Sequence, residues 1–310
     1  MVRFRQIEPD CENGEETYPF KAQSNIIIMK MYLVIIMIYS GKGVTAAVLD
    51  TGINPHMDFD HRIVYFKDFL KGQKSPYDDN GHGTHVAGIL AGSGAASLGK
   101  YKGVAPGCNI VALKILDQKG LGNSENLIKS IQWLIENHRK YGIRIVNISV
   151  GGINSEENNQ KAINAYADRL WEEGVVVVAA AGNGGPDSAT ITAPGSSCKV
   201  ITVGSSDMIY EKTGASGRGP VGNCLFKPDI VAPGNRIISC SGRNSYMEKS
   251  GTSMSTPRVA GAIALLVEKE PELTNEEIKY RLCQTSDNLY LSRNIQGCGQ
   301  LNIKKLLSFL

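Results

Sequence analysis

The chain contains 310 residues, of which 42% are hydrophobic and 20% are charged, and its formal net charge is +3. This composition is ordinary for a globular protein and supplies enough apolar side chains for a sizeable core. No dense block of Lys and Arg occurs along the chain, so the sequence lacks the electrostatic footprint of a nucleic-acid-binding protein.

The N-terminal segment contains a nearly continuous apolar run over residues 26–39, interrupted by Lys30. The run is shorter than the ~20 residues that span a bilayer, and the leader before it is acidic. Two interpretations stay open: a membrane or export signal, or a buried or misread segment. We assign residues 1–40 to an N-terminal extension of uncertain structure and residues 41–310 to one domain.

Short apolar runs recur from residue 44 onward and are separated by helical patterns. Each run is continuous rather than alternating, which is typical of strands buried on both faces of a parallel sheet. The predicted strands cover residues 44–49, 110–116, 143–149, 175–181, 200–203 and 230–232.

The segments between these runs predict helices. Ser124 is expected to cap a helix with a single apolar stripe, and Thr274 with Glu277 forms a capping-box pattern for a helix to about residue 285. Further helices are expected over residues 158–173 and from Ser253 to about residue 268. This alternation predicts an α/β fold, a three-layer α/β/α sandwich with a mostly parallel sheet, whose functional site lies at the carboxyl ends of the strands.

The seven cysteines are scattered, and no two of them form a C-x-x-C pair. This pattern indicates neither a zinc ribbon nor a small scaffold built on disulfides. We therefore expect free thiols in a reducing cytosol. The positions are Cys11, Cys108, Cys198, Cys224, Cys240, Cys283 and Cys298.

Three Gly-containing segments each carry a side chain suited to nucleophilic catalysis. Asp50 ends a predicted buried strand, His82 and His85 lie in a Gly-rich entry to a helix, and Ser253 precedes an apolar helix. Pro257 is tolerated in the first turn of a helix, which places Ser253 at the helix N-terminus, where developing negative charge is favoured.

These side chains are the parts of an acyl-transfer site. A serine hydroxyl becomes a good nucleophile when an imidazole takes its proton, and a buried carboxylate orients the imidazole. The tetrahedral intermediate needs donors aimed at its oxyanion, and Asn183, which follows a buried strand, offers a side-chain amide. A turn role for Asn183 before Gly184 stays open.

Four motifs resemble those of the subtilisin-like (subtilase, peptidase S8) family, in family order. They are AAVLDTG at Asp50, HGTHVAG at His82, AAGN at Asn183 and GTSM-x-TP at Ser253, and the similarity runs from about residue 41 to 301. The resemblance implies a seven-stranded parallel sheet and a serine endopeptidase with an Asp50–His82–Ser253 triad and an Asn183 oxyanion hole. It also implies protein or peptide substrates and no cofactor for the chemistry.

The resemblance further assigns substrate-binding residues. Two segments would pair with the backbone of an extended substrate by strand addition; they contribute Gly120, Leu121 and Gly122 on one side and Ser149, Val150, Gly151 and Gly152 on the other. Ala180, Gly182 and Thr192 would line the S1 pocket, and Ser124, Leu127 and Val150 would border S4. Small uncharged walls predict broad cleavage after large uncharged residues.

The loop over residues 92–103 departs from the family pattern because it contains no carboxylate, while Asp58 is the one nearby match to a calcium ligand. Structural calcium is therefore possible but unsupported, and we predict no metal site. The loop and the short leader resemble intracellular bacterial subtilases, which predicts a cytoplasmic protein, with secretion as the alternative. Membrane association is not expected, although residues 26–39 leave it open.

Two other functions compete with this interpretation. Asp50, His82 and His85 could ligate a metal, although Ser253 and Asn183 would then have no role. A non-enzymatic relative could use the fold for binding, although such relatives usually lose a triad member.

Overall fold

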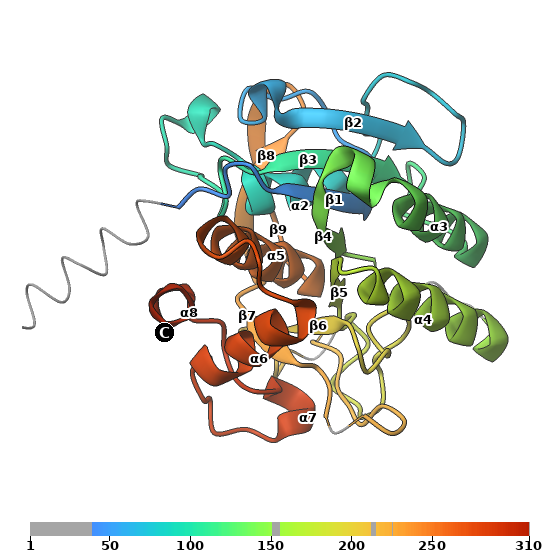
Figure 1. Ribbon diagram of the computed structural model, residues 1–310, viewed down its shortest axis with the longest axis vertical. Helices are drawn as coiled ribbons and strands as arrows, with labels where there is room; N and C mark the ends of the chain where they lie inside the picture. Colours follow the sequence, from blue (N-terminus) through green and yellow to red (C-terminus); the bar gives the residue numbers. More distant parts are fainter. Residues whose placement is uncertain (1–38, 151–155, 212–214, 225, 310) are drawn as a thin grey trace, which may run out of the picture.

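Seven strands form one parallel sheet in the computed structural model, which describes residues 39–150, 156–211, 215–224 and 226–309 (Figure 1). The strand order is β2-β3-β1-β4-β5-β6-β7, and every pairing is parallel. The strands are β1 (Thr45–Asp50), β2 (Ile63–Asp68), β3 (Asn109–Lys114), β4 (Ile143–Ile148), β5 (Val176–Ala180), β6 (Ile201–Ser205) and β7 (Ile230–Ala232). The seven-stranded sheet confirms the predicted fold class.

Helices cover both faces of this sheet. Helices α3 (Ser124–Tyr141) and α4 (Glu157–Glu172) lie side by side on one face, and α2 (His82–Ala91) and α5 (Thr252–Lys269) pack together on the other (Figure 1). Shorter helices complete the chain: 3-10 helices η1 (Asp60–Arg62) and η2 (Ala95–Ser97), and α6 (Asn275–Thr285), α7 (Arg293–Gln296) and α8 (Ile303–Ser308). No helix in the described ranges is both long and apolar enough to cross a membrane.

Two helix starts test the capping predictions. The Thr274–Glu277 capping box is confirmed at α6. The prediction for α3 is wrong by one residue: Asn123 is the N-cap, its side chain accepts a hydrogen bond from the Asn126 N–H, and Ser124 is the first helical residue. Both Asn and Ser cap helices well, so the sequence alone does not separate them.

The proline argument for α5 is also wrong in detail. The helix begins at Thr252, so Pro257 lies beyond its first turn. Without an N–H, Pro257 cannot bond the carbonyl of Ser253 four residues earlier. The conclusion drawn from it nevertheless holds, since Ser253 is the second residue of the helix.

An antiparallel hairpin lies outside the main sheet and was not predicted. Its strands are β8 (Ile237–Ser241) and β9 (Ser245–Lys249), and β8 packs on α2. His85 Nε2 lies 3.0 Å from the carbonyl oxygens of both Ile237 and Met247, and burial lowers the pKa of His85 to about 4 despite these two contacts. The neutral His85 ring therefore connects α2 to the hairpin.

The expectation of free thiols is wrong for four cysteines. Disulfides join Cys198 to Cys224 and Cys283 to Cys298, whereas Cys108 and Cys240 are buried free thiols. The paired residues are 26 and 15 positions apart, and folding, not a local motif, brings them together. Gly151, Gly152, Cys11 and residues 26–38 lie outside the described residues.

Candidate active site

Asp50 and His82 meet where β1 ends and α2 begins. His82 Nδ1 lies 2.7 Å from Asp50 Oδ1, and the Asp50 side chain is 1% exposed. Gly83 permits this approach, because a Cβ at that position would lie only 2.2 Å from the Gly52 carbonyl oxygen and 3.1 Å from Asp50 Cβ. The pair has the geometry that the carboxylate and imidazole of a catalytic triad require.

The electrostatics of His82 combine opposing effects. Burial of the ring disfavours its charged form, but the Asp50 carboxylate and its hydrogen bond outweigh burial and raise the pKa of His82 above the ordinary value. Lys249, at the end of β9, acts in the opposite direction. The ring is thus able to accept a proton and hold it as a stabilised imidazolium.

Asp78 holds the start of α2 in place, a role that the sequence analysis missed. Its carboxylate accepts hydrogen bonds from the Gly81 N–H at 2.7 Å, the Thr84 N–H at 2.9 Å and the Thr51 hydroxyl at 2.8 Å. Burial opposes ionisation of Asp78, but these donors lower its pKa. The signal was its position four residues before His82.

Lys114 stabilises the other side of the region where β1 ends and α2 begins. Its fully buried ammonium group donates to the Thr51 carbonyl at 2.5 Å, the Leu116 carbonyl at 2.9 Å and Asp79 Oδ1 at 2.6 Å. A charge buried at the end of β3 is satisfied only when these partners stay in position. The strand ends that carry Asp50 are therefore tied together.

Ser253 faces the same cleft from the N-terminus of α5. Its hydroxyl donates to the Ser149 carbonyl at 2.8 Å. Because a hydroxyl carries one proton, this arrangement does not donate to His82, and the hydroxyl must turn away from the Ser149 carbonyl to do so. Catalytic hydrogen bonds often tighten only when substrate is bound.

Asn183 follows β5 and faces the start of α5. Its Oδ1 accepts from the Thr252 N–H at 3.0 Å and from the Thr252 hydroxyl at 3.2 Å. These two donors fix the amide orientation and leave its NH₂ group available to an oxyanion. Gly251 has a φ of +146°, and a Cβ there would lie 3.3 Å from Asn183 Nδ2, so glycine keeps the amide uncrowded.

A cleft of about 290 Å³ brings together the predicted His82, Gly120, Ser149, Val150, Asn183 and Ser253. Its lining comprises Thr51, Asn80, His82, Leu116, Lys119, Gly120, Ser149, Val150, Asn183 and Ser253. A larger cavity of about 770 Å³ is lined by Trp171, Lys199 and Lys279 among others, and it contains none of the predicted residues. The predicted catalytic side chains of His82, Asn183 and Ser253 therefore share the smaller, polar cleft.

The remaining predicted residues lie around the cleft rather than in its lining. Leu121 is 64% exposed, and Leu127 is fully buried within α3. The others are the half-buried Ser124 and Thr192, the buried Ala180 and Gly182, and Gly122, where a Cβ would meet the Leu116 side chain at 2.5 Å.

The metal alternative for Asp50, His82 and His85 does not fit this geometry. His82 Nδ1 is committed to Asp50, and the Nε2 of His85 faces the β8–β9 hairpin. The family's calcium site is also poorly matched, because the described loop 92–103 contains no carboxylate and Asp58 accepts the N–H groups of Gly94 and Ala96 instead.

Comparisons with known proteins identify the family of the chain. The Subtilase family model matches residues 41–299. The chain is 42% identical over 290 residues to Serine protease AprX of Bacillus subtilis (strain 168), covering 85% of this chain and 66% of that protein. It is 36% identical over 263 residues to Subtilisin Savinase of Lederbergia lenta, covering 85% and 90%. The chain thus spans slightly less than two thirds of AprX and nearly all of Subtilisin Savinase.

A solved structure shares the fold. A cold adapted subtilisin-like serine proteinase superposes with a TM-score of 0.69 at 32% identity, covering 85% of this chain and 88% of that chain. Together the sheet topology, the motif residues and the family match lead to one assignment. The chain belongs to the subtilase family of serine endopeptidases.

Proposed function

We propose that Asp50, His82 and Ser253 form the catalytic triad of this endopeptidase and that Asn183 supplies its oxyanion hole. The observation that carries the proposal is the 2.7 Å contact between His82 Nδ1 and Asp50 Oδ1, in a cleft also lined by Ser253 and Asn183. A carboxylate held on Nδ1 leaves Nε2 of the imidazole as the base.

The reaction begins when the Ser253 hydroxyl turns from Ser149 toward His82. His82 Nε2 takes the hydroxyl proton while Oγ attacks the substrate carbonyl carbon. The oxyanion accepts from the Asn183 amide and from the Ser253 N–H in the first turn of α5. His82 then protonates the leaving amine, and water hydrolyses the acyl-enzyme by the same path.

Substrate binding follows from the two segments beside the cleft. Asp117 forms a turn with this segment: it accepts the N–H groups of Gly120 and Leu121, and its own N–H donates to the Leu121 carbonyl. The Gly120 carbonyl and the backbone groups of Gly122 would therefore pair with a substrate lying between them and Ser149–Gly152. Ala180, Gly182 and Thr192 would form S1; Ser124 and Val150 would border S4 above a floor at the buried Leu127.

The chemistry needs no cofactor, and its partners are protein or peptide substrates. The two disulfides favour the secreted alternative over the cytoplasmic expectation, because structural disulfides persist in oxidising compartments. The domain division at residue 40 and the absence of nucleic-acid or membrane partners stay predictions.

A fluorophosphonate probe tests the proposal directly. The purified chain is expected to be labelled once, at Ser253 by peptide mass mapping, and Ser253→Ala is expected to be unlabelled. Ser255→Ala is the matched control, because this buried serine of the same helix donates to the Ala232 carbonyl. Labelling elsewhere, or none in a folded chain, would favour the non-enzymatic relative.

A further inference from the structure

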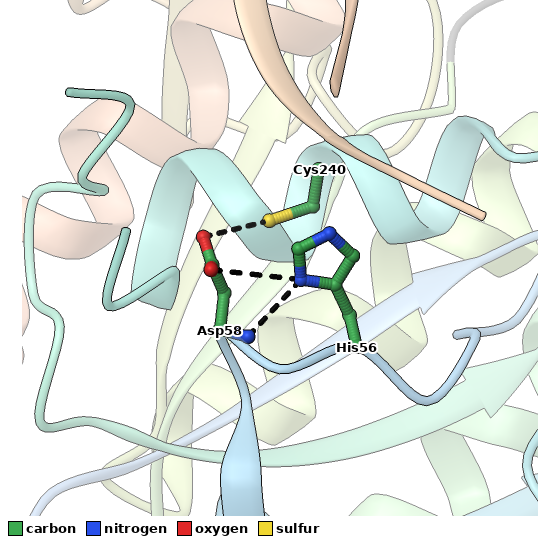
Figure 2. A group of neighbouring side chains, drawn as sticks. All are labelled: His56, Asp58 and Cys240. Atoms are coloured by element: carbon green, nitrogen blue, oxygen red, sulfur yellow. Dashed lines mark hydrogen bonds and ion pairs between the residues drawn. The ribbon is translucent and has the colours of Figure 1, made fainter. Parts of the chain in front are cut away.

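Three side chains with different donor atoms converge away from the catalytic cleft (Figure 2). His56 and Asp58 come from the turn between β1 and β2, and Cys240 comes from β8. His56 is 6% exposed, and Asp58 and Cys240 are fully buried. One ligand atom from each residue lies within 4.8 Å of the other two. The mechanism above uses none of them.

We propose that His56, Asp58 and Cys240 form a binding site for a borderline-soft divalent cation, with Zn²⁺ the best match. Tetrahedral zinc, with bonds of about 2.0–2.3 Å, places its ligand atoms roughly 3.3–3.6 Å apart. Asp58 Oδ1 lies 3.6 Å from His56 Nδ1, and Asp58 Oδ2 lies 3.3 Å from Cys240 Sγ. These two contacts involve different oxygens of the Asp58 carboxylate, so a cation would bind both oxygens, or one of them after a small rotation of the carboxylate. One ligand atom from each of the three residues already lies within 4.8 Å of the other two, so a contraction of the site would bring them to tetrahedral spacing.

The surrounding hydrogen bonds orient these ligands as metal sites require. His56 Nε2 lies 3.1 Å from the Ser245 carbonyl oxygen, and donation to that oxygen leaves Nδ1 as a lone-pair donor. Nδ1 now accepts the Asp58 N–H at 3.0 Å, a contact that the cation would replace. The Asp58 carboxylate is held by the N–H groups of Gly94 at 3.0 Å and Ala96 at 2.9 Å.

A fourth donor is also at hand. The Tyr246 hydroxyl, from the residue after Ser245 in β9, lies 2.9 Å from both carboxylate oxygens of Asp58. Either this oxygen or a water would complete four-coordination. One nitrogen, one sulfur and one carboxylate do not suit Ca²⁺, which takes six to eight oxygen ligands.

Cation binding would replace the hydrogen bond from the Cys240 thiol with a metal–sulfur bond, and no atom would change its oxidation state. In the metal-free protein the Cys240 S–H donates to Asp58 Oδ2. The cation would take the sulfur lone pair, and the thiol proton would leave to solvent. The bound state then carries a thiolate, an ionised Asp58 and a neutral His56, so the two negative charges neutralise the divalent ion.

The location indicates a stabilising role rather than a catalytic one. A Cβ at Gly88 of α2 would lie 2.7 Å from Cys240 Sγ and 2.4 Å from Ser239 Oγ, so the ligand strand is packed tightly on that helix. The same helix begins at His82, and the hairpin leads into the helix of Ser253. A cation here would fasten the turn at residues 56–58 to the scaffold of both catalytic residues.

Cobalt titration tests the site in a chain that cannot digest itself. The background is Ser253→Ala with Cys11→Ser, stripped with chelator and exchanged into chelator-free buffer. One equivalent of Co²⁺ is expected to produce a near-ultraviolet cobalt–thiolate charge-transfer band, and Zn²⁺ is expected to abolish it. Zn²⁺, unlike Ca²⁺ at the same concentration, is expected to raise the thermal midpoint.

Matched variants identify the thiol. Cys240→Ser is expected to lose the band and to weaken Co²⁺ binding at least tenfold, whereas Cys108→Ser, at the other buried free cysteine of the described residues, keeps both. His56→Asn retains the thiol and is expected to weaken binding similarly, which keeps the test valid if Cys240→Ser does not fold. Absence of a thiolate band in the background chain, or its persistence in Cys240→Ser, would overturn the proposal. Because Ser253 is absent throughout, neither result depends on protease activity.

Discussion

At the scale of single residues, His82 is the group whose charge controls the proposed reaction. Burial opposes its protonated form, the Asp50 carboxylate favours that form more strongly, and the pKa of His82 is raised as a result. Lys249 repels the imidazolium and limits the rise. The pH dependence of activity should therefore reflect the charges of both Asp50 and Lys249.

Activity requires neutral His82, so kcat/KM is expected to rise with pH through an apparent pKa above about 6.5. Lys249→Met removes the repelling charge, raises the pKa of His82 further and shifts this limb to higher pH. Lys129→Met, on the exposed side of α3, should leave the limb in place. A Lys249→Met profile that is unmoved, or moved to lower pH, contradicts the electrostatic account.

Asn183 offers a second residue-scale test. Its NH₂ group is free while Thr252 holds its oxygen, so it should bond the oxyanion more strongly than the ground-state carbonyl. Asn183→Leu is expected to lower kcat by ~10²–10³ with KM nearly unchanged, a magnitude taken from the family rather than from this structure. A change confined to KM in steady-state kinetics would make Asn183 a turn or binding residue.

The sequence was sufficient to predict the candidate catalytic residues, but it did not predict the residues that hold them in position. Asp50, His82, Asn183 and Ser253 lie in motifs whose neighbours are close in sequence, so a linear pattern identifies them. Asp78 joins Thr51 to Gly81 and Thr84 through hydrogen bonds that exist only after folding. Its position four residues before His82 is the one sequence signal, and that position does not reveal which groups Asp78 binds.

At the scale of elements, the junction of β1 and α2 positions the base. Strands with continuous apolar runs were predictable because both of their faces are buried. β2 was missed because it is a partly exposed edge strand, and the β8–β9 hairpin was missed because most of β9 lies at the surface. Half-exposed strands lack the apolar run on which the prediction depended.

A substitution at Gly83 tests whether the close contact between β1 and α2 positions His82. Gly83→Ala would place a methyl group 2.2 Å from the Gly52 carbonyl oxygen, so the start of α2 must move away from β1. Overpacking of this kind costs about 1–3 kcal/mol, and we expect a fall in kcat/KM of roughly 10²-fold from the displaced base.

The matched control is Gly242→Ala in the hairpin turn, where the nearest atom to the new methyl group is Asn54 Nδ2 at 3.6 Å. Its kcat/KM and thermal midpoint should stay near those of the parent. Equal kinetics for Gly83→Ala and the parent would mean that the close approach does not position His82.

At the scale of the whole molecule, the disulfides connect segments that the sequence leaves far apart. Six of the seven cysteines lie in the described residues, all except Cys11. Among these six, alkylation of the unfolded chain without reductant should modify Cys108 and Cys240 and spare Cys198, Cys224, Cys283 and Cys298. Peptide mass mapping reads the result, and prior reduction should expose all of them. Modification of all six without reductant would restore the expectation of a reducing cytosol.

The central claim is that Asp50, His82 and Ser253 act as one catalytic unit, and a double-mutant cycle on kcat measures it most directly. Ser253→Ala and His82→Ala should each lower kcat by about 10⁶-fold, the family's value, and the double variant should be little worse than either. Each variant must keep the parent's circular dichroism and thermal midpoint. Losses that multiply in the double variant would show two independent contributions and contradict the triad.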